Sequence, residues 1–172
     1  PHDATTAISR LDTMIDRLPS ALNLFRLLEA RPQLLDMMMD VLCLAPTLAA
    51  DLSRRPDLLD GLIDATALRL PPEIDAIAER LRHDDPDADL EQRLDKVRRE
   101  VGEMRFALGV QIVEGTSDPV DVAAGYARVA EAAIRVVADA VKAEYEATHG
   151  RVPDSELIIL ALGRMGGAEL TH

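Results

Sequence analysis

Two long segments with helical periodicity constrain the fold more than any other feature of this sequence. In the first, residues 88–114, apolar side chains recur at steps of three and four residues, which is the pattern of a coiled-coil seam. They are Leu90, Leu94, Val97, Val101, Met104, Leu108 and Ile112. Gly115 predicts the end of this helix. Asp118 and Pro119 predict the start of a second helix, which we expect to reach His149. Its inner face would carry Val122, Tyr126, Val129, Ala133, Val136, Val137, Ala140 and Val141. Because the connecting loop is short, the two helices should pack antiparallel.

Prolines divide the preceding part of the chain into short helices. A first amphipathic helix is predicted over Thr5–Arg17, and Ser20 is the expected N-cap of the next one. Each later proline ends one helix and permits the start of another, because proline lacks the N–H that a helix interior needs. These prolines are Pro32, Pro46, Pro56, Pro71 and Pro72. A further short helix is predicted over Glu73–His83.

A short internal repeat lies among these helices. The motif Arg31-Pro32-Gln33-Leu34-Leu35-Asp36 recurs as Arg55-Pro56-Asp57-Leu58-Leu59-Asp60. Leu28 and Leu52 precede the two copies at the same offset. The pattern predicts a helix-turn-helix unit used twice, with paired leucines in the core. Two copies are too few for a solenoid, which needs about three or more.

Composition supports an all-α fold and limits the possible functions. Aromatic residues, which favour sheets, make up 2% of the chain. The net charge of −12 argues against binding a nucleic-acid backbone, because that affinity depends on Lys and Arg. The single cysteine cannot form an internal disulfide, which is compatible with a reducing cytoplasm. No apolar run approaches the roughly 20 residues of a membrane span. We therefore expect a cytoplasmic protein that binds neither nucleic acid nor membrane.

The character of the sequence changes after Gly150. The continuous apolar run Glu156–Gly163 favours a buried strand, although periodicity alone does not distinguish it from a buried helix. Gly163, Gly166 and Gly167 follow; glycines after a strand let the backbone approach a phosphate, and their N–H groups can donate to it. The spacing matches neither G-x-G-x-x-G nor a Walker A loop, so a flexible turn is the alternative. One strand cannot make a sheet, and we expect the chain to stop inside a new domain.

Three parts are therefore expected. Residues 1–70 form a linker of short helices, residues 71–150 form a helical bundle with the two long helices, and residues 151–172 begin a truncated domain.

Other candidate groups have simpler structural interpretations. Cys43 lies in an apolar stretch and is predicted to be a buried, inert thiol. The run Met37-Met38-Met39 is predicted to fill the core. The acidic cluster lacks the pattern of a calcium loop and is predicted to be a solvated turn; its members are Asp84, Asp85, Asp87 and Asp89. The histidines show no metal-ligand spacing; they are His2, His83, His149 and His172.

The combination of these segments resembles a known family, glutamine synthetase adenylyltransferase, also called glutamate–ammonia-ligase adenylyltransferase. The resemblance is carried by the Arg-Pro-x-Leu-Leu-Asp repeat, the two long helices and the segment Ile158–Leu170. The family signature is an apolar strand, then Gly-Lys-Leu-Gly-Gly-x-Glu-Leu, then Ser-Asp-x-Asp in the next strand. Here Arg164 and Met165 stand where the family has Lys-Leu. The resemblance covers essentially the whole chain and favours the C-terminal half of the parent protein.

The resemblance implies a fold, an activity and partners. Residues 151–172 would hold the first strand and glycine turn of a polymerase-beta-type nucleotidyltransferase domain, with Gly163, Gly166 and Gly167 in nucleotide binding. The parent would be a bifunctional enzyme that transfers AMP from ATP to a tyrosine of glutamine synthetase and removes it by phosphorolysis. Its expected partners are glutamine synthetase, the PII regulatory protein, ATP and Mg²⁺.

The same resemblance implies that this fragment is inactive by itself. The carboxylates that bind metal would lie in the Ser-Asp-x-Asp segment, and the sequence ends before it. No catalytic or metal-binding residue is therefore predicted within the chain. The alternative is an independent helical protein-interaction module without catalysis. The sequence that follows His172 would distinguish the two.

Overall fold

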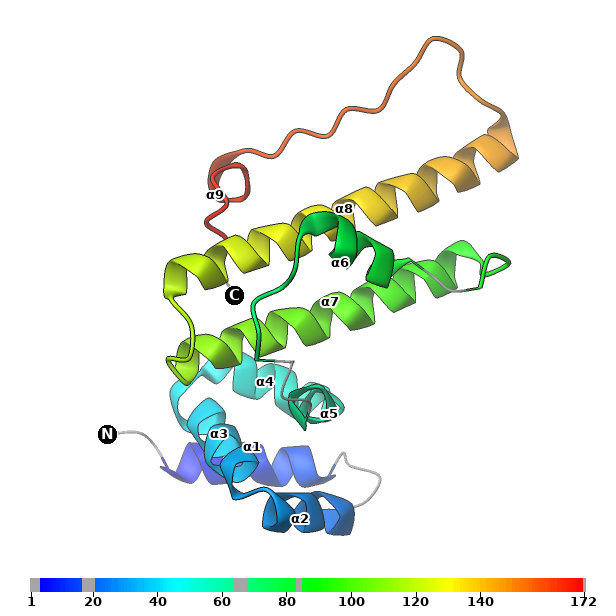
Figure 1. The fold of residues 1–172 in the computed structure, drawn as a ribbon. Coiled ribbons are helices and arrows are strands. Elements are labelled where there is room, and N and C mark those ends of the chain that lie inside the picture. The colour runs from blue at the N-terminus through cyan, green and yellow to red at the C-terminus, as the bar shows by residue number, and fades with distance from the viewer. Residues whose placement is uncertain (1–3, 17–20, 64–67, 83–84, 172) are drawn as a thin grey trace. The chain divides into compact units, whose positions relative to one another are not determined.

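The computed structural model describes residues 4–16, 21–63, 68–82 and 85–171. Throughout these residues the regular elements are helices, and the predicted all-α fold is confirmed (Figure 1). They are α1 (Ala4–Asp16), α2 (Ala21–Ala30), α3 (Pro32–Leu44), α4 (Pro46–Arg54), α5 (Leu58–Ile63), α6 (Ile74–Leu81), α7 (Leu90–Val113), α8 (Pro119–His149) and α9 (Gly163–Gly166). Arg17, the expected end of α1, and Ser20, the expected N-cap of α2, lie outside the described residues.

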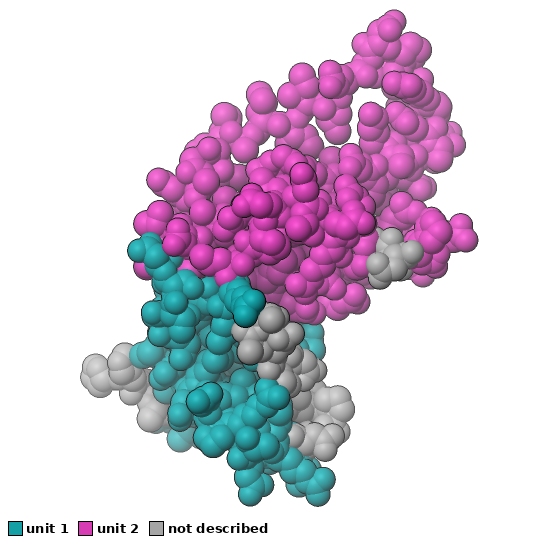
Figure 2. Space-filling view, viewed as in Figure 1, with its two compact units in different colours: residues 1–69, 106–118 teal, residues 70–105, 119–172 magenta. Residues whose placement is uncertain are grey.

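The chain forms two compact units (Figure 2). Unit 1 comprises residues 1–69 and 106–118, and unit 2 comprises residues 70–105 and 119–172. The long helix α7 contributes its N-terminal part to unit 2 and its last turns to unit 1. Each unit is thus built from segments that are separated in the sequence.

Unit 1 packs short helices around an apolar core. α1 contacts α3 and α4, and α3 also contacts α2 and α4. Pro32 and Pro46 occupy the first turn of α3 and of α4, where a missing N–H costs nothing. Pro56 does not start a helix directly, because α5 begins at Leu58. The buried core consists of Met14, Leu24, Leu28, Leu34, Met38, Val41, Leu42, Leu48, Ala49, Leu52, Leu58, Leu59, Leu62, Phe106 and Val110.

The two copies of the repeat supply paired core leucines, as predicted. The leucines buried at equivalent positions are Leu28 with Leu52 and Leu34 with Leu58. The copies differ at their second leucine, because Leu59 is 3% exposed whereas its counterpart Leu35 is 39% exposed. The second copy therefore buries both leucines of its Leu-Leu pair.

Unit 2 combines α6, the N-terminal part of α7, and α8. α6 packs along α8. The Arg80 guanidinium on α6 pairs with the carboxylates of Glu100 and Glu103 on α7, at 2.8 and 3.7 Å. α7 and α8 run in opposite directions, as the short loop between them predicts (Figure 1). The Tyr126 hydroxyl on α8 donates a hydrogen bond to the backbone carbonyl of Arg105 on α7 at 3.0 Å.

The seam predicted for α7 is only partly correct. Val97 and Leu108 are buried, but Ile112 is 42% exposed. The side chains buried near this end of the helix include Phe106, Val110 and Gln111. The physical reason is that a seam assumes one partner helix, whereas the last turns of α7 enter the core of unit 1. On α8, Val141 is likewise exposed rather than on the inner face, because it lies in the exposed last turns of that helix.

Gly115 ends α7 as predicted. Its φ is +63°, a left-handed conformation that glycine adopts without strain. The Gly115 N–H donates to the Ile112 carbonyl at 3.2 Å, and the Thr116 N–H donates to the Gln111 carbonyl at 3.1 Å. These two bonds form the Schellman motif that commonly closes a helix.

Among the described residues, no single helix is long and apolar enough to cross a membrane. The helices α3 and α4 together have the required length and apolar character, but they are bent by 116° at the break between them.

Candidate functional site

The segment between α8 and α9, which we call the strap (residues 150–162), does not form the predicted strand. Gly150, with a φ of +79°, ends α8, and residues 151–162 contain no helix or strand. The large apolar side chains from Leu157 to Leu162 are 52–81% exposed. A strand needs hydrogen-bond partners on a neighbouring strand, and the described residues offer none. The strand expected over Glu156–Gly163 is therefore replaced by an irregular, exposed apolar segment.

The predicted glycines lie together in a single helical turn, α9. We call residues 163–169 the glycine turn. Gly163 enters it with a φ of +60°. The turn closes with a Schellman motif, in which the Ala168 N–H donates to the Met165 carbonyl at 3.1 Å and the Glu169 N–H donates to the Arg164 carbonyl at 2.8 Å. Ala168 has a φ of +56°, which is uncommon for a residue with a side chain.

The adjacent glycines Gly166 and Gly167 differ in the space around them. A methyl group at Gly166 would lie 2.6 Å from the carbonyl oxygen of Ala161, so the turn itself requires glycine there. A methyl group at Gly167 would meet nothing nearer than the Gly163 carbonyl oxygen at 3.5 Å, an ordinary contact. The local backbone thus explains Gly166 but not Gly167.

The amides of the glycine turn are already engaged. The Gly167 N–H donates to the Gly163 carbonyl at 3.0 Å, and the Gly166 N–H donates to the Leu162 carbonyl at 3.5 Å. With the two bonds of the Schellman motif, all four N–H groups of residues 166–169 donate to backbone carbonyls of residues 162–165. A phosphate held by the amide of Gly166 or Gly167 would have to replace one of these bonds. The exposed side chain of Arg164 supplies a positive charge beside the turn.

The residues that follow the turn lie against the long helices (Figure 1). Leu170 and Thr171 line a cavity of about 390 Å³. Its other walls include Val101 and Arg105 of α7 and Tyr126, Val129, Ala133 and Ile134 of α8. Within residues 150–171, Met165 and Leu170 are half-buried and the remaining side chains are exposed. The chain directly after the glycine turn therefore lies beside α7 and α8, at Leu170 and Thr171.

Comparison with known proteins assigns the chain to a family. Residues 35–172 match the profile described as Glutamate-ammonia ligase adenylyltransferase. The chain belongs to this adenylyltransferase family. It is 32% identical over 169 residues to a protein of Brucella suis described as a bifunctional glutamine synthetase adenylyltransferase/adenylyl-removing enzyme. Proteins of the same description from Mesorhizobium japonicum and Agrobacterium fabrum are 34% and 31% identical. No solved structure matches the chain significantly.

The adenylyltransferase relatives are much longer than this chain. Each of the three alignments covers 98% of the chain and 17% of the relative. The residues that match the family profile include α7, α8 and the glycine turn, whereas α1 and α2 precede them.

The cysteine and the methionine run on α3 lie in or beside the core of unit 1. Cys43 on α3 is half-buried rather than fully buried, because its neighbours Val41 and Leu42 take the core-facing positions of that helix. Met38 is 2% exposed, and Met37 and Met39 pack against the core of unit 1. The prediction that the methionine run fills the core is confirmed.

One member of the acidic cluster, Asp89, caps a helix. Asp84 lies outside the described residues, and Asp85 and Asp87 are exposed. The Asp89 carboxylate accepts the Gln92 N–H at 2.8 Å, while the Gln92 side-chain oxygen accepts the Asp89 N–H at 2.9 Å. This reciprocal pair is a capping box at the start of α7. Among the described residues, no three or more His, Cys, Asp or Glu side chains group so that they could hold a metal ion.

Histidine does not contribute to a site in the described part of the chain. His2, His83 and His172 lie outside the described residues. His149 ends α8, and its ring centre lies 4.8 Å from that of Tyr145.

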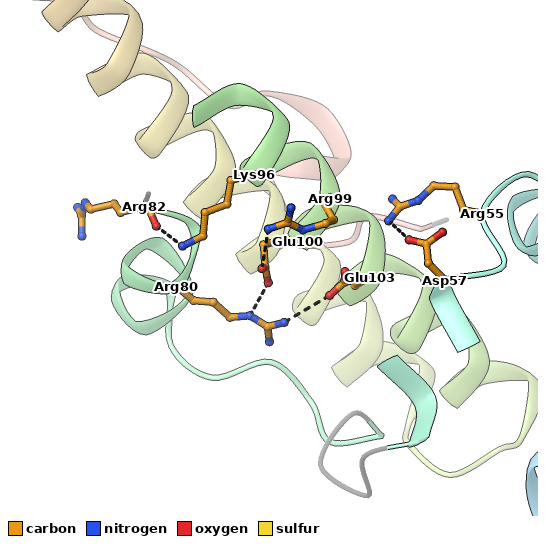
Figure 3. Close-up of polar contacts among 8 residues, drawn as sticks. All are labelled: Arg55, Asp57, Arg80, Arg82, Lys96, Arg99, Glu100 and Glu103. Atoms are coloured by element: carbon orange, nitrogen blue, oxygen red, sulfur yellow. Dashed lines mark hydrogen bonds and ion pairs between the residues drawn. The ribbon is translucent and has the colours of Figure 1, made fainter. Parts of the chain in front are cut away.

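Sequence reasoning missed the polar contacts that join α6 to α7 (Figure 3). Besides its ion pair with Arg80, Glu100 lies 3.7 Å from the Arg99 guanidinium. The Lys96 ammonium donates to the Arg82 backbone carbonyl. Glu100 and Glu103 are three residues apart on one helix, so a single arginine can reach both carboxylates. That spacing was the available signal, but it does not reveal which arginine lies opposite. Figure 3 also shows the Arg55–Asp57 ion pair of unit 1, at 2.8 Å.

Two polar side chains in unit 1 were also missed. Gln111 is 0% exposed; its amide donates to the Arg69 carbonyl at 3.3 Å, and its side-chain oxygen accepts the Ser117 hydroxyl at 2.7 Å. Burial, together with Asp40 and Asp36 on α3, raises the pKa of the Glu114 carboxyl. The Oε1 atom of Glu114 is buried and accepts no hydrogen bond from the described residues.

Proposed function

We propose that this chain is part of a bifunctional enzyme that attaches AMP to glutamine synthetase and removes it. The supporting observation is that the family match runs through residues 35–172 and so includes the glycine turn. This match favours the enzyme over an independent helical interaction module. The chain spans 17% of the length of its curated relatives, so the activity belongs to the longer protein that would contain it.

Within that protein, we propose that the glycine turn borders the triphosphate of ATP. Gly163 and Gly166 give the turn its shape, since one has a positive φ and the other has no room for a methyl group. Gly167 is not required by the turn, which is what close approach of a ligand would explain. The transfer would join AMP to a tyrosine hydroxyl of glutamine synthetase with release of pyrophosphate. Removal would use inorganic phosphate to take the AMP as ADP.

The longer protein would also supply the metal site. The printed sequence contains no Ser-Asp-x-Asp segment, in which the family places the carboxylates for Mg²⁺. Bound Mg²⁺ would stabilise negative charge on the phosphates during transfer. We therefore propose that the 172-residue chain alone does not transfer AMP. We further propose that the longer protein is cytoplasmic and responds to a PII regulatory protein.

The two adjacent glycines give a test with a built-in comparison. Gly167→Ala and Gly166→Ala would each be introduced into the longer protein, and transfer of labelled AMP from ATP to glutamine synthetase would be measured with ATP titrated. Gly167→Ala should raise the KM for ATP about tenfold with unchanged unfolding, because the methyl group would meet ligand rather than protein. Gly166→Ala should lower both activity and stability, because it displaces the turn. Full activity of Gly167→Ala would overturn the assignment of the turn, and absence of AMP transfer by the unmodified protein would overturn the function.

A further inference from the structure

We propose that Leu170 is a positioning residue, which fixes the glycine turn by docking into the groove between α7 and α8. The groove is the cavity of about 390 Å³ described above. The positioning role rests on the proposed function, because it assigns the nucleotide to the glycine turn. The docking contact itself does not depend on that assignment.

Leu170 differs from the strap leucines in its surroundings and not in its chemistry. Leu157, Leu160 and Leu162 are 62%, 78% and 81% exposed. Leu170 is half-buried and lines the cavity with residues of both long helices. Burying apolar surface gives a favourable contribution that is proportional to the area covered. Unlike the strap leucines, Leu170 therefore lies against residues of α7 and α8.

The groove is suited to receive one apolar side chain. Val129, Ala133 and Ile134 give it an apolar wall on α8. Tyr126 of α8 donates a hydrogen bond from its hydroxyl to the Arg105 carbonyl of α7 at 3.0 Å, which links the two helices at this place. Tyr126 is itself 3% exposed, so it forms a fixed wall rather than a mobile one. The segment that lies against the helices at this groove is Leu170–Thr171 of the same chain, and it forms the remaining wall.

The short distance along the chain couples this contact to the turn. Leu170 follows Gly167 by three residues, and three residues span at most about 10 Å. A docked Leu170 therefore restricts where Gly167 can lie relative to α7 and α8. If Leu170 leaves the groove, the glycine turn keeps its own hydrogen bonds but loses this contact with α7 and α8.

The groove has room for a larger side chain, which makes the contact adjustable. Leu170 and Thr171 lie at its edge, and about 390 Å³ of the groove stays unfilled by protein. A larger side chain at Ala133 would fill part of this space and hold the docked segment more tightly. The contact can thus be weakened from one side, by Leu170→Asp, and strengthened from the other, by Ala133→Leu.

Limited trypsin digestion of the 172-residue chain tests the docking directly. Arg151 in the strap and Arg164 in the glycine turn are both exposed, and cleavage at these two sites produces fragments 1–151 and 1–164. A protease needs a locally opened chain, and the docked turn should resist cleavage at Arg164. Initial rates of the two fragments, measured by mass spectrometry, therefore compare the turn with the strap in the same molecule.

The expected results differ among matched variants. Leu170→Asp should increase the rate of fragment 1–164 about fivefold or more, because undocking leaves the turn free to open. Leu160→Asp makes the same chemical change at a side chain that is 78% exposed, and should leave both rates unchanged. Ala133→Leu should slow cleavage at Arg164, and Leu170→Met should keep the protection. Leu170→Ala provides a milder change if the aspartate variant loses helical circular dichroism. Equal effects of Leu170→Asp and Leu160→Asp would overturn the docking.

A second measurement separates positioning from docking alone. In the longer protein, Leu170→Asp should raise the KM for ATP about fivefold or more at an unchanged unfolding midpoint, and Leu170→Met should restore it. If trypsin detects undocking but the KM does not change, the positioning role is wrong while the proposed function stands. If the unmodified protein transfers no AMP, the proposed function and the positioning role are both wrong, and the trypsin result still reports whether Leu170 docks.

Discussion

Gly109 provides a test in which two opposing effects can be compared quantitatively. It lies inside α7, where replacing glycine by alanine normally stabilises a helix by about 1 kcal/mol. It is also buried against α4, and an added methyl group would lie 2.6 and 2.9 Å from the two Cδ atoms of Leu48 and 3.2 Å from its Cγ. Leu48 is 4% exposed and has little room to turn aside. Overpacking of this kind costs about 1–3 kcal/mol. We therefore expect Gly109→Ala to destabilise the chain by about 1 kcal/mol net.

A double-mutant cycle checks the cause of this loss. Urea unfolding followed by far-UV circular dichroism would be measured for the wild type, Gly109→Ala, Leu48→Ala and the double variant. With Leu48 shortened, the clash disappears and Gly109→Ala should stabilise by about 1 kcal/mol. The sign should thus reverse, with a coupling energy of about 2 kcal/mol between the two sites. Stabilisation by Gly109→Ala in the wild-type background, or the same effect in both backgrounds, would refute the reasoning.

Three further substitutions have defined consequences. Gln111→Leu should destabilise the chain by about 1–3 kcal/mol in urea unfolding, because the Arg69 carbonyl and the Ser117 hydroxyl each lose a hydrogen bond. Tyr126→Phe should cost about 1 kcal/mol through the lost hydrogen bond. Burial, opposed in part by a nearby arginine, raises the pKa of Tyr126 to about 12. Because the unfolded tyrosine ionises near 10, wild-type stability should fall between pH 10 and pH 12, and the phenylalanine variant should lack this component of the fall. Glu114→Gln should stabilise the chain at pH 7 by about 0.5 kcal/mol, because it removes a charge that is desolvated and repelled by Asp40 and Asp36. The difference in stability between Glu114→Gln and the wild type should shrink as the pH falls through the raised pKa of Glu114 toward 4.5, because the wild-type carboxyl is then protonated and uncharged. A difference that does not change with pH would contradict this explanation.

Local features of the sequence predicted local features of the fold. Pro32, Pro46 and Pro119 begin helices because their effect depends only on their own ring and missing N–H. Gly115 ends a helix for a similarly local reason, its positive φ. The three candidate glycines of the site lie in one turn because they are close together in the chain. Such features need no knowledge of distant residues.

The errors concern side chains whose partners are distant. The run from Leu157 to Leu162 has strand composition, but a strand forms only when another strand is beside it. Ile112 is exposed and Gln111 is buried because the last turns of α7 belong to the core of unit 1. The contact of Leu170 with α7 and α8 was equally invisible, since nothing in its own neighbourhood of the sequence distinguishes it from Leu160.

The division of α7 between the two units has a consequence for the order in which the protein folds on the ribosome. The core of unit 1 requires Phe106 and Val110, which are synthesised well after residue 69. At about 5–20 residues per second, the ribosome needs roughly two to seven seconds to advance from residue 69 to residue 106. During that interval the apolar faces of α3 and α4 have been made but lack their last partners, so the nascent chain exposes a surface that chaperones can bind. Slower translation of residues 70–105 would lengthen this exposure and should increase chaperone dependence without changing the final fold.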